Sequence, residues 1–466
     1  MRFLPFIFGI ILLGGCAVYH PQPISPEKTA SDFDARSLTN DGLRSFLETN
    51  HVVGPWPRES WDLKALTLAA FYYRPAFAEA RATWAAAKAA EITAGERPNP
   101  SVTVTPAYDS QVPETPTPWI VPVTFDVPIE TAGKRGKRIA EANHLADSAR
   151  WDFISVAWQT RSKVRAALLD LLAARANESL LTGQMLAQSN VVRLLEGQRA
   201  AGSISDYEVT QARVTLETTQ LARQDAIGRI GQARAALAAA LGVPLRALDG
   251  VRFSYGPLDR FPRDLTRPEV RRQALFNRAD VRSALADYAA SQAALQIEIA
   301  NQYPDIHLGP GYAYNSGNAG DNEWELGLTV TLPVLNQNQG AIAEAEAKRS
   351  QAAAHFLSVQ TAAVSEIDSA LAGYNAALKE SATAQSLRDD LQRQLKSVKA
   401  QAQLGEADAL SLADAESAYY TGAQDHLNTL IKAQQALGAL EDAVQSPLTL
   451  TPETLEEAEK DLSKSK

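Results

Sequence analysis

The side chains that most often carry out chemistry are few in this chain, and their spacing does not bring them together. The sequence has one cysteine, Cys16, and six histidines: His20, His51, His144, His307, His355 and His426. No two histidines lie four residues apart, whereas a zinc site needs three or four converging ligands. No glycine-rich phosphate loop follows a strand pattern, and no motif pairs a nucleophile with a base. We therefore expect no catalytic residues, no metal site, no cofactor and no enzyme activity.

Cys16 is the exception, because the residues before it form a pattern in which a single cysteine has a known role. Met1-Arg2 is followed by the apolar run Phe3–Leu13 and then by Gly14-Gly15-Cys16. A helix of this run spans about 17 Å, too short for a bilayer core of ~30 Å, so the run is typical of an export signal. The tract Leu13-Gly14-Gly15-Cys16 resembles the bacterial lipobox, in which the cysteine is diacylated and becomes the mature N-terminus. The residue that follows, Ala17, is similar to the signal for outer-membrane sorting. This predicts a lipid attachment at Cys16.

Composition narrows the class of protein. The chain has 466 residues, 45% of them hydrophobic and 21% charged, with a net charge of −9. This is ordinary globular usage, which argues against disorder and against a disulfide scaffold. An acidic chain is also a poor candidate for coating nucleic acid, so we expect no nucleic-acid partner.

The chain after residue 60 contains an internal duplication. Ile139-Ala140-Glu141-Ala142 recurs as Ile342-Ala343-Glu344-Ala345, and Ala201-Gly202-Ser203 aligns with Leu404-Gly405-Glu406 at the same shift of about 203. The predicted division is a signal peptide 1–15, a lipidated N-terminal tether 16–60, a first structural repeat 61–244, an inter-repeat equatorial segment 245–266, a second structural repeat 267–446 and a charged C-terminal tail 447–466.

Each repeat reads as helix, two strands, long helix and shorter helix. Strands are expected at about 101–108, 120–129, 305–314 and 323–333, where apolar residues alternate with polar ones and predict one apolar face. The long segments, about 137–200 and 340–403, have the 3,4 spacing of amphipathic helices near 96 Å in length. The leading helices are expected to run unbroken over 63–95 and 268–301.

Three smaller patterns lie in or next to the expected strands. Trp119, Tyr312, Tyr314 and Trp324 lie at strand ends, as an interfacial aromatic girdle would, with buried core aromatics as the alternative. His307 alternates with apolar neighbours and is expected on the interior face. The basic tract Lys134–Arg138 is interpreted as solvated wall or lipid-headgroup contact rather than as a polyanion site.

Four strands cannot close a barrel, and unpaired strand edges are not tolerated in lipid. The chain must therefore borrow strands from copies of itself. Two copies give eight strands and a filled interior, whereas three give twelve and a lumen that holds water. The predicted fold is mainly α with a β-barrel part: a duplicated helix-strand-strand-helix-helix unit that forms a trimeric, 12-stranded transmembrane β-barrel continuous with a long periplasmic α-helical barrel.

The lipobox-like start, the duplicated halves, the strand-ending Pro128-Ile129 and Pro333-Val334, and the hairpin tracts 201–206 and 404–410 resemble the TolC family of outer membrane factors. The tract Pro128–Arg135 is similar to the branch that serves heavy-metal pumps of the resistance-nodulation-division class, the CzcC/CusC-like branch. The resemblance implies an outer membrane efflux lipoprotein, a homotrimer that spans the outer membrane of a Gram-negative bacterium and is lipid-anchored at its periplasmic face.

The resemblance also implies partners and sites. The hairpin tips at Gly202 and Gly405 would dock the periplasmic adaptor, a membrane fusion protein, and an inner-membrane proton-driven transporter would supply the energy. Acidic residues six and nine positions after the tip glycine form the constriction in related ducts. Here those positions hold Glu208, Ser411 and Asp414, so the periplasmic gate is expected at Glu208 and Asp414, with Ser411 a departure from the pattern.

The expected function is a passive exit duct of a tripartite efflux system that carries small toxic solutes, drugs or heavy-metal cations, to the exterior. Two alternatives stay open: a type I protein-secretion exit duct, and a non-porous periplasmic structural lipoprotein. The alternating strands favour a duct, because a spacer has no use for four apolar strand faces.

Overall fold

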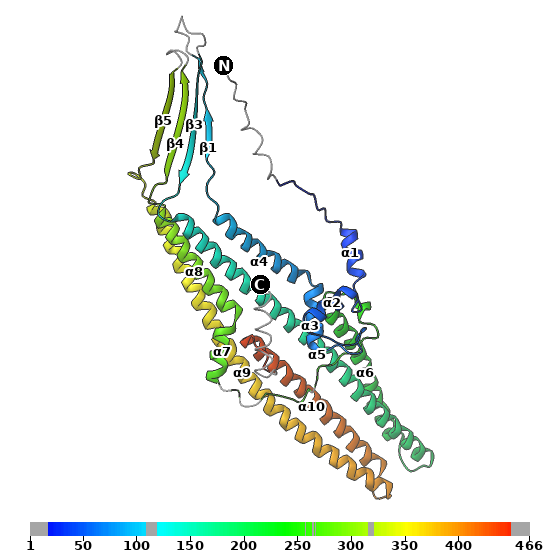
Figure 1. Ribbon diagram of the computed structural model, residues 1–466. Coiled ribbons are helices and arrows are strands. Elements are labelled where there is room, and N and C mark those ends of the chain that lie inside the picture. Colours follow the sequence, from blue (N-terminus) through cyan, green and yellow to red (C-terminus); the bar gives the residue numbers. More distant parts are fainter. Residues whose placement is uncertain are drawn as a thin grey trace.

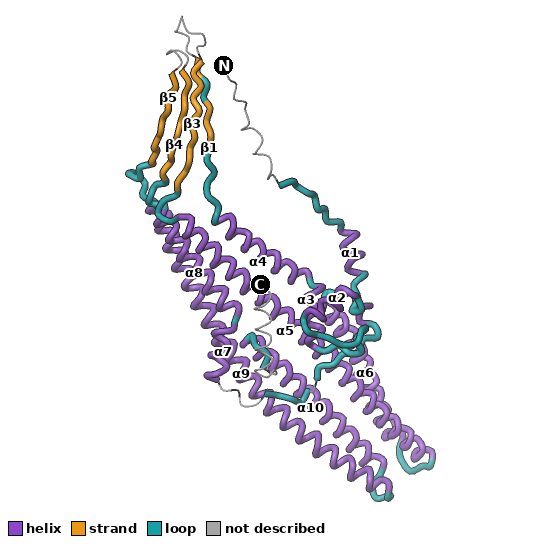
Figure 2. The backbone as a smooth tube through the Cα atoms, in the orientation of Figure 1, coloured by secondary structure: helices purple, strands orange, loops and turns teal. Residues whose placement is uncertain are grey.

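The computed structural model describes residues 17–108, 119–256, 258–262, 265, 267–315 and 321–448. The signal peptide, Cys16 and the tail from residue 449 therefore lie outside the described residues. The protein is mainly helical, with one antiparallel sheet that projects from one end of a long helical slab (Figures 1 and 2). Across the described ranges, we find no helix that combines the length and the apolar character needed to cross a bilayer.

The first repeat follows two short N-terminal helices, α1 (Pro26–Asp34) and α2 (Asp41–Thr49). Its elements are α3 (Leu63–Tyr73), α4 (Pro75–Ala94), β1 (Ser101–Val104), β2 (Ala107–Tyr108), β3 (Trp119–Ile129), α5 (Lys134–Ala200) and α6 (Asp206–Leu241). A short 3-10 helix, η2 (Leu245–Leu248), begins the inter-repeat segment, which adds one parallel bridge between Trp61 and Phe253.

The second repeat has the same order of elements. They are α7 (Arg267–Asn277), α8 (Ala279–Ala300), β4 (Ile306–Asn315), β5 (Asp321–Val330), α9 (Gln339–Gln403) and α10 (Ala409–Val444). The long helices α5 and α9 have 67 and 65 residues, or roughly 100 Å each at 1.5 Å per residue.

The expectation of unbroken leading helices was wrong, because each is two helices joined at one extended residue. In the first repeat the joint is Arg74, with ψ at 124°. Pro75 follows it, and a residue before proline is disfavoured in the α region. In the second repeat the joint is Arg278, with ψ at 121°, although no proline follows.

The two joint arginines make the same long-range contact. Arg74 Nη1 donates to the carbonyl of Ala240, at 3.3 Å, and Arg278 Nη1 donates to the carbonyl of Ala443, at 2.8 Å. Both carbonyls belong to the last turn of the closing helix of the repeat, where helical carbonyls have no partner within the helix. Arg278 is buried and also donates to Asp280. A buried guanidinium thus holds the second joint in the extended conformation without the help of proline.

The sheet has the order β1-β3-β4-β5, with β2 paired to β3 beyond β1. All ladders are antiparallel, and β4 pairs with β5 without interruption from Ile306–Val330 to Asn315–Asp321. Among the described strands, β1 and β5 each pair on one side only, so both edges of this sheet are open within one chain.

The helices form a layer that is four helices wide, as the sheet is four main strands wide. Next to the sheet, α4 packs on α5, α5 on α8, and α8 on α9; farther away, α6 packs on α5, α5 on α10, and α10 on α9. Figure 1 shows this slab with the α5–α6 and α9–α10 hairpins ending together, far from the strands. One flank of the whole chain is β1, α4 and α6, and the other is β5 and α9.

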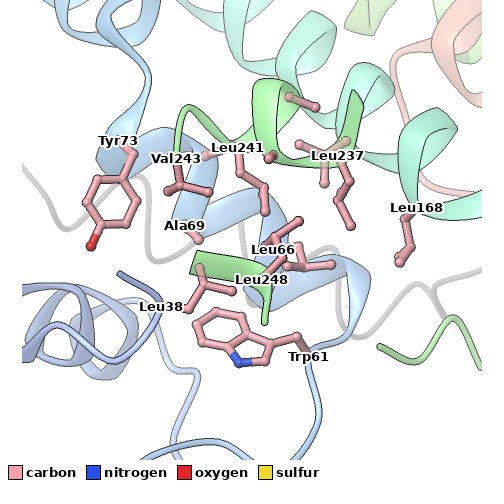
Figure 3. Close-up of a cluster of buried hydrophobic side chains, with 14 of the residues drawn as sticks. Leu38, Trp61, Leu66, Ala69, Tyr73, Leu168, Leu237, Leu241, Val243 and Leu248 are labelled. Atoms are coloured by element: carbon pink, nitrogen blue, oxygen red, sulfur yellow. The ribbon is translucent and has the colours of Figure 1, made fainter. Parts of the chain in front are cut away.

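The largest core lies at mid-height of the first repeat (Figure 3). Leu66 and Ala69 of α3 pack there with Leu237 and Leu241 of α6. The residues assigned to an N-terminal tether contribute to this core, because Leu38, and Leu43 and Leu47 of α2, are fully buried in it. The second repeat has a smaller core around Ile367 and Tyr374 of α9.

Candidate functional site

The first surface that suggests a function is one face of the sheet, which is apolar from edge to edge. The pairing places Val104, Val123, Tyr312 and Trp324 in one row across all four main strands. The row below it holds Pro310 and Leu326, and Trp324 and Leu326 are 82% and 76% exposed. Contiguous apolar patches of this kind are rare on soluble monomers. This face is built to contact lipid or protein.

The opposite face is polar and anionic. Its charged side chains are Asp126, Glu323 and Glu325, and among the described strand residues it has no lysine or arginine. His307 lies on this face, as its alternation with apolar neighbours predicted, and its Nδ1 is 2.9 Å from Asp126 Oδ1. The two faces together have the alternation of a strand that separates lipid from water.

Aromatic rings gather on the apolar face at the end of the sheet that is remote from the helices. Tyr108 and Trp119 meet edge to face with ring centroids 5.2 Å apart, and the rings of Tyr312 and Trp324 are tilted against each other with centroids 4.9 Å apart. Tyr108, Trp119 and Trp324 are exposed and Tyr312 is half-buried, so none of the four is a core residue, which is the arrangement of an interfacial girdle.

The basic tract at the base of the sheet ties the two repeats together. Lys134 is buried and its Nζ donates to Asp305 Oδ1 at 2.8 Å, while the backbone N–H of Thr131 donates to the same oxygen at 3.0 Å. Arg138 pairs with Glu130 and Arg135 donates to the Gly95 carbonyl. The interpretation of this tract as solvated wall missed these contacts, which fix where β3 ends and α5 begins.

A second cluster links the repeats at mid-height, between α5 and α10. Arg165 is buried and pairs with Glu441 and Asp442, at 3.4 and 3.3 Å. Burial raises the pKa of Asp442, against the opposing effect of Ser162 and the arginines. The guanidinium of Arg165 occupies the space that a Cβ at Gly438 would take. A glycine in the C-terminal part of α10 therefore admits the buried charge.

The hairpin tips have the geometry that their glycines require. Gly202 and Gly405 have φ of +74° and +79°, in the left-handed region that other residues avoid. Each tip is followed by a capped helix: Asp408 accepts from the Ser411 N–H at 2.7 Å, and Glu208 Oε2 accepts from the Ser205 N–H at 2.8 Å. Both tips lie at the same end of the slab (Figure 1).

The two residues expected at the gate lie within two helical turns of these caps, in corresponding helices. Glu208 and Asp414 are both exposed. Glu208 also closes a capping box with Ser205, a role that the Ser-x-x-Glu spacing could have revealed in the sequence. Its carboxylate therefore stabilises the start of α6 as well as adding negative charge at this end of the molecule.

The described ranges contain no group of three or more histidine, cysteine, aspartate or glutamate side chains that could hold a metal ion. The lipid attachment predicted at Cys16 lies outside these ranges. The structure thus brings the hairpin tips and the acidic positions to one end, and the strands with their two faces to the other.

Two curated proteins resemble parts of this chain. The cobalt-zinc-cadmium resistance protein CzcC of Cupriavidus metallidurans is 28% identical over 233 residues, which are 50% of this chain and 54% of that protein. The pyoverdine export outer membrane protein OpmQ of Pseudomonas aeruginosa is 26% identical over 213 residues, 44% of each. The matches thus span about half the length of these relatives.

The fold is that of known outer-membrane channels. A crystal structure of CusC, a protein that forms a transmembrane channel, aligns with a TM-score of 0.66 and 19% identity, over 84% of this chain and 94% of that one. The family model "Outer membrane efflux protein" matches residues 70–243 and 270–444, which are most of each repeat. The chain therefore belongs to the outer membrane efflux protein family, and its place is the outer membrane.

Proposed function

We propose that three copies of this chain close into one continuous duct through the outer membrane and the periplasm, and that this duct is the passive exit of a tripartite efflux system. The observation that carries the proposal is the four-element slab. Its sheet has one apolar and one anionic face, and both of its flanks are open from the strands to the hairpin tips.

Closure follows from the open edges. Unpaired N–H and C=O groups of β1 and β5 are costly in lipid, so each edge needs a strand from another copy. The two edges belong to opposite flanks, and a contact between unlike flanks generates a ring when the rotation from one copy to the next closes. Two copies would give eight strands and an interior filled by side chains, whereas three give twelve strands and a lumen. The apolar face then contacts lipid and the anionic face lines water.

The helices extend the lumen into the periplasm. With α5 and α9 roughly 100 Å long, the tips at Gly202 and Gly405 reach toward the inner membrane, where a periplasmic adaptor would bind them. The carboxylates of Glu208 and Asp414 would form the gate at this narrow end, where a ring of acids selects cations. An inner-membrane proton-driven transporter would provide the energy, and a lipid on Cys16 would hold each chain at the periplasmic leaflet.

Heavy-metal cations are the cargo that the sequence and the lumen favour. The partial similarity to CzcC supports this class, and so does the polar sheet face, whose charged groups are acidic. The similarity to OpmQ, a pyoverdine export protein, supports a different cargo. Protein secretion by a type I system would use the same duct, because the wall alone does not distinguish these cargoes.

Conductance across planar bilayers tests the duct directly. The purified protein should form long-lived, cation-selective channels whose conductance depends on Glu208 and Asp414. A non-porous periplasmic lipoprotein would give no steps above background, and that result would refute the proposal. Cargo is tested separately: deletion of the gene should raise sensitivity to cobalt, zinc and cadmium without a change in pyoverdine export.

A further inference from the structure

The contact between the two repeats indicates how copies of the chain meet. β3 of the first repeat pairs with β4 of the second, in the register that places Thr124 opposite Gly311. The free edges of the sheet, β5 and β1, are the equivalents of β3 and β4 in the opposite repeats (Figure 1). A ring of copies would therefore bring β5 of one copy beside β1 of the next, as β3 lies beside β4 within one chain.

Two landmarks give the offset between β3 and β5. Pro128-Ile129 at the end of β3 aligns with Pro333-Val334, 205 positions later. The residue before the long helix is left-handed in both repeats, with φ of +68° at Gly133 and +63° at Asn338, and these two residues are also 205 positions apart. β5 and the residues that follow it can thus be matched to β3 residue by residue.

The offset between β1 and β4 is nearly the same. Pro100-Ser101 aligns with Pro304-Asp305, 204 positions later, and each tract lies at the start of its strand. Because both offsets are known, each pair of residues between the repeats converts into one pair between neighbouring copies.

We propose that β5 pairs antiparallel with β1 and β2 of the next copy in the register that these offsets define, an inference that rests on the trimeric duct proposed above. Thr124 opposite Gly311 then becomes Thr329 opposite Ala107 of the next copy. Thr329 and Ala107 are both exposed in the single chain, on the strands that form its two free edges.

The two faces of the sheet agree with this register. Val127 opposite Leu308 converts into Leu332 opposite Val104 of the next copy; Leu332 is 71% exposed and Val104 is 52% exposed. A slip by one residue would turn the apolar face of one copy toward the lumen, so only slips of two residues compete. The ladder should end at Leu332, because the Val334 N–H turns back to the Leu332 carbonyl at 2.9 Å.

The base of the sheet differs between the two kinds of contact. Between the repeats, the Lys134 ammonium and the Thr131 N–H both donate to Asp305 Oδ1, at 2.8 and 3.0 Å. At the same offsets the residues equivalent to Lys134 and Asp305 are Gln339 and Ser101 of the next copy, and both are exposed in the single chain. Hydrogen bonds between ionised groups are roughly twice as strong as neutral ones. The contact between copies is therefore the weaker of the two at this level.

Cysteine pairs test the register. Thr329→Cys with Ala107→Cys should form disulfides between copies under mild oxidation, which yield covalent trimers on a non-reducing denaturing gel. In the equivalent pair within the chain, a Cβ at Gly311 would lie 3.5 Å from Thr124 Oγ1, so side chains at this pair are in contact. Opposite residues of antiparallel strands have the Cβ separation that a disulfide needs.

Shifted pairs are the matched controls. Ala107→Cys with Thr331→Cys, or with Gly327→Cys, is two residues out of register in one direction or the other. Diagonal neighbours lie about 7–8 Å apart, so both controls should cross-link about tenfold less. The single variants Thr329→Cys and Ala107→Cys control for disulfides that involve Cys16.

An ion pair introduced at the base tests the second part of the proposal. Gln339→Lys with Ser101→Asp should reproduce between copies the contact of Lys134 with Asp305, and should slow dissociation of the trimer in sodium dodecyl sulfate by about tenfold. Each single substitution should give no such slowing, because it adds a charge without its partner.

The outcomes separate this inference from the duct itself. Stronger cross-linking of either shifted pair, or no cross-linking in protein that native mass spectrometry shows to be trimeric, would overturn the register. A double variant that dissociates as fast as its single parents would overturn the equivalence at the base. Protein that is monomeric would refute the trimeric duct, and the inference with it.

Discussion

Two neighbouring residues of β5 test which face of the sheet meets lipid. Leu326 lies on the apolar face near the middle of the strand, and Glu325 lies beside it on the anionic face. An arginine on the lipid face near the bilayer midplane costs about 2–4 kcal/mol per chain. Leu326→Arg should therefore destabilise a trimer by roughly 6–12 kcal/mol, whereas Glu325→Arg should cost ~0–1 kcal/mol per chain, because its site already accepts a charge in water.

The assay is a urea titration of folding into phospholipid vesicles, followed by tryptophan emission. Leu326→Gln controls for the loss of the leucine packing, and should lie between the wild type and Leu326→Arg. The lipid-facing variant should lose its folded signal at far lower urea than the lumen-facing one. Equal costs for the two arginines, or a larger cost for Glu325→Arg, would show that the faces are assigned wrongly.

Three further predictions concern the gate, the packing of Arg165 between α5 and α10, and the loss of stability in acid. The double substitution Glu208→Ala with Asp414→Ala should raise single-channel conductance. Glu208→Gln keeps an acceptor for the helix cap, so it should raise conductance without loss of thermal stability. Unchanged conductance would refute the assignment of the gate. Gly438→Ala should lower stability by about 1–3 kcal/mol in thermal unfolding, because the new Cβ meets the buried Arg165 guanidinium, and an unaltered melting temperature would contradict that packing. Burial acts to raise the pKa of Asp280, but hydrogen bonds and charge from its arginine partner lower it overall. The contribution of ionised Asp280 to the free energy of unfolding is thus present above the unfolded-state pKa near 3.9 and is lost as pH falls through the lower native pKa. Asp280→Asn should therefore flatten the plot of stability against pH below about pH 4. A plot as steep as that of the wild type would argue against the pairing of Asp280 with Arg278.

Periodic patterns made the long elements predictable from sequence. The 3,4 spacing over 340–403 persists because one stripe of α9 packs on α8 and α10 along its whole length. The alternation at 323–333 persists because the two faces of β5 meet different surroundings. The internal repeat also made the helical hairpins predictable, since Gly202 and Gly405 occupy equivalent turns with positive φ.

Features that depend on long-range contacts escaped prediction. The joint at Arg278 has no local signal, because the carbonyl of Ala443 that stabilises it is 165 residues away. The pairing of Lys134 with Asp305 likewise needs the two repeats to meet at the base of the sheet. A basic tract in isolation reads as solvated surface, and only the fold reveals its partner.

The number of chains in the purified assembly tests the central claim most directly. Native mass spectrometry of the protein extracted in mild detergent should give three times the mass of the mature chain, with the lipid mass on each copy. A monomer, or a dimer that could supply only eight strands, would contradict the account, because neither closes a water-filled lumen from a four-stranded chain.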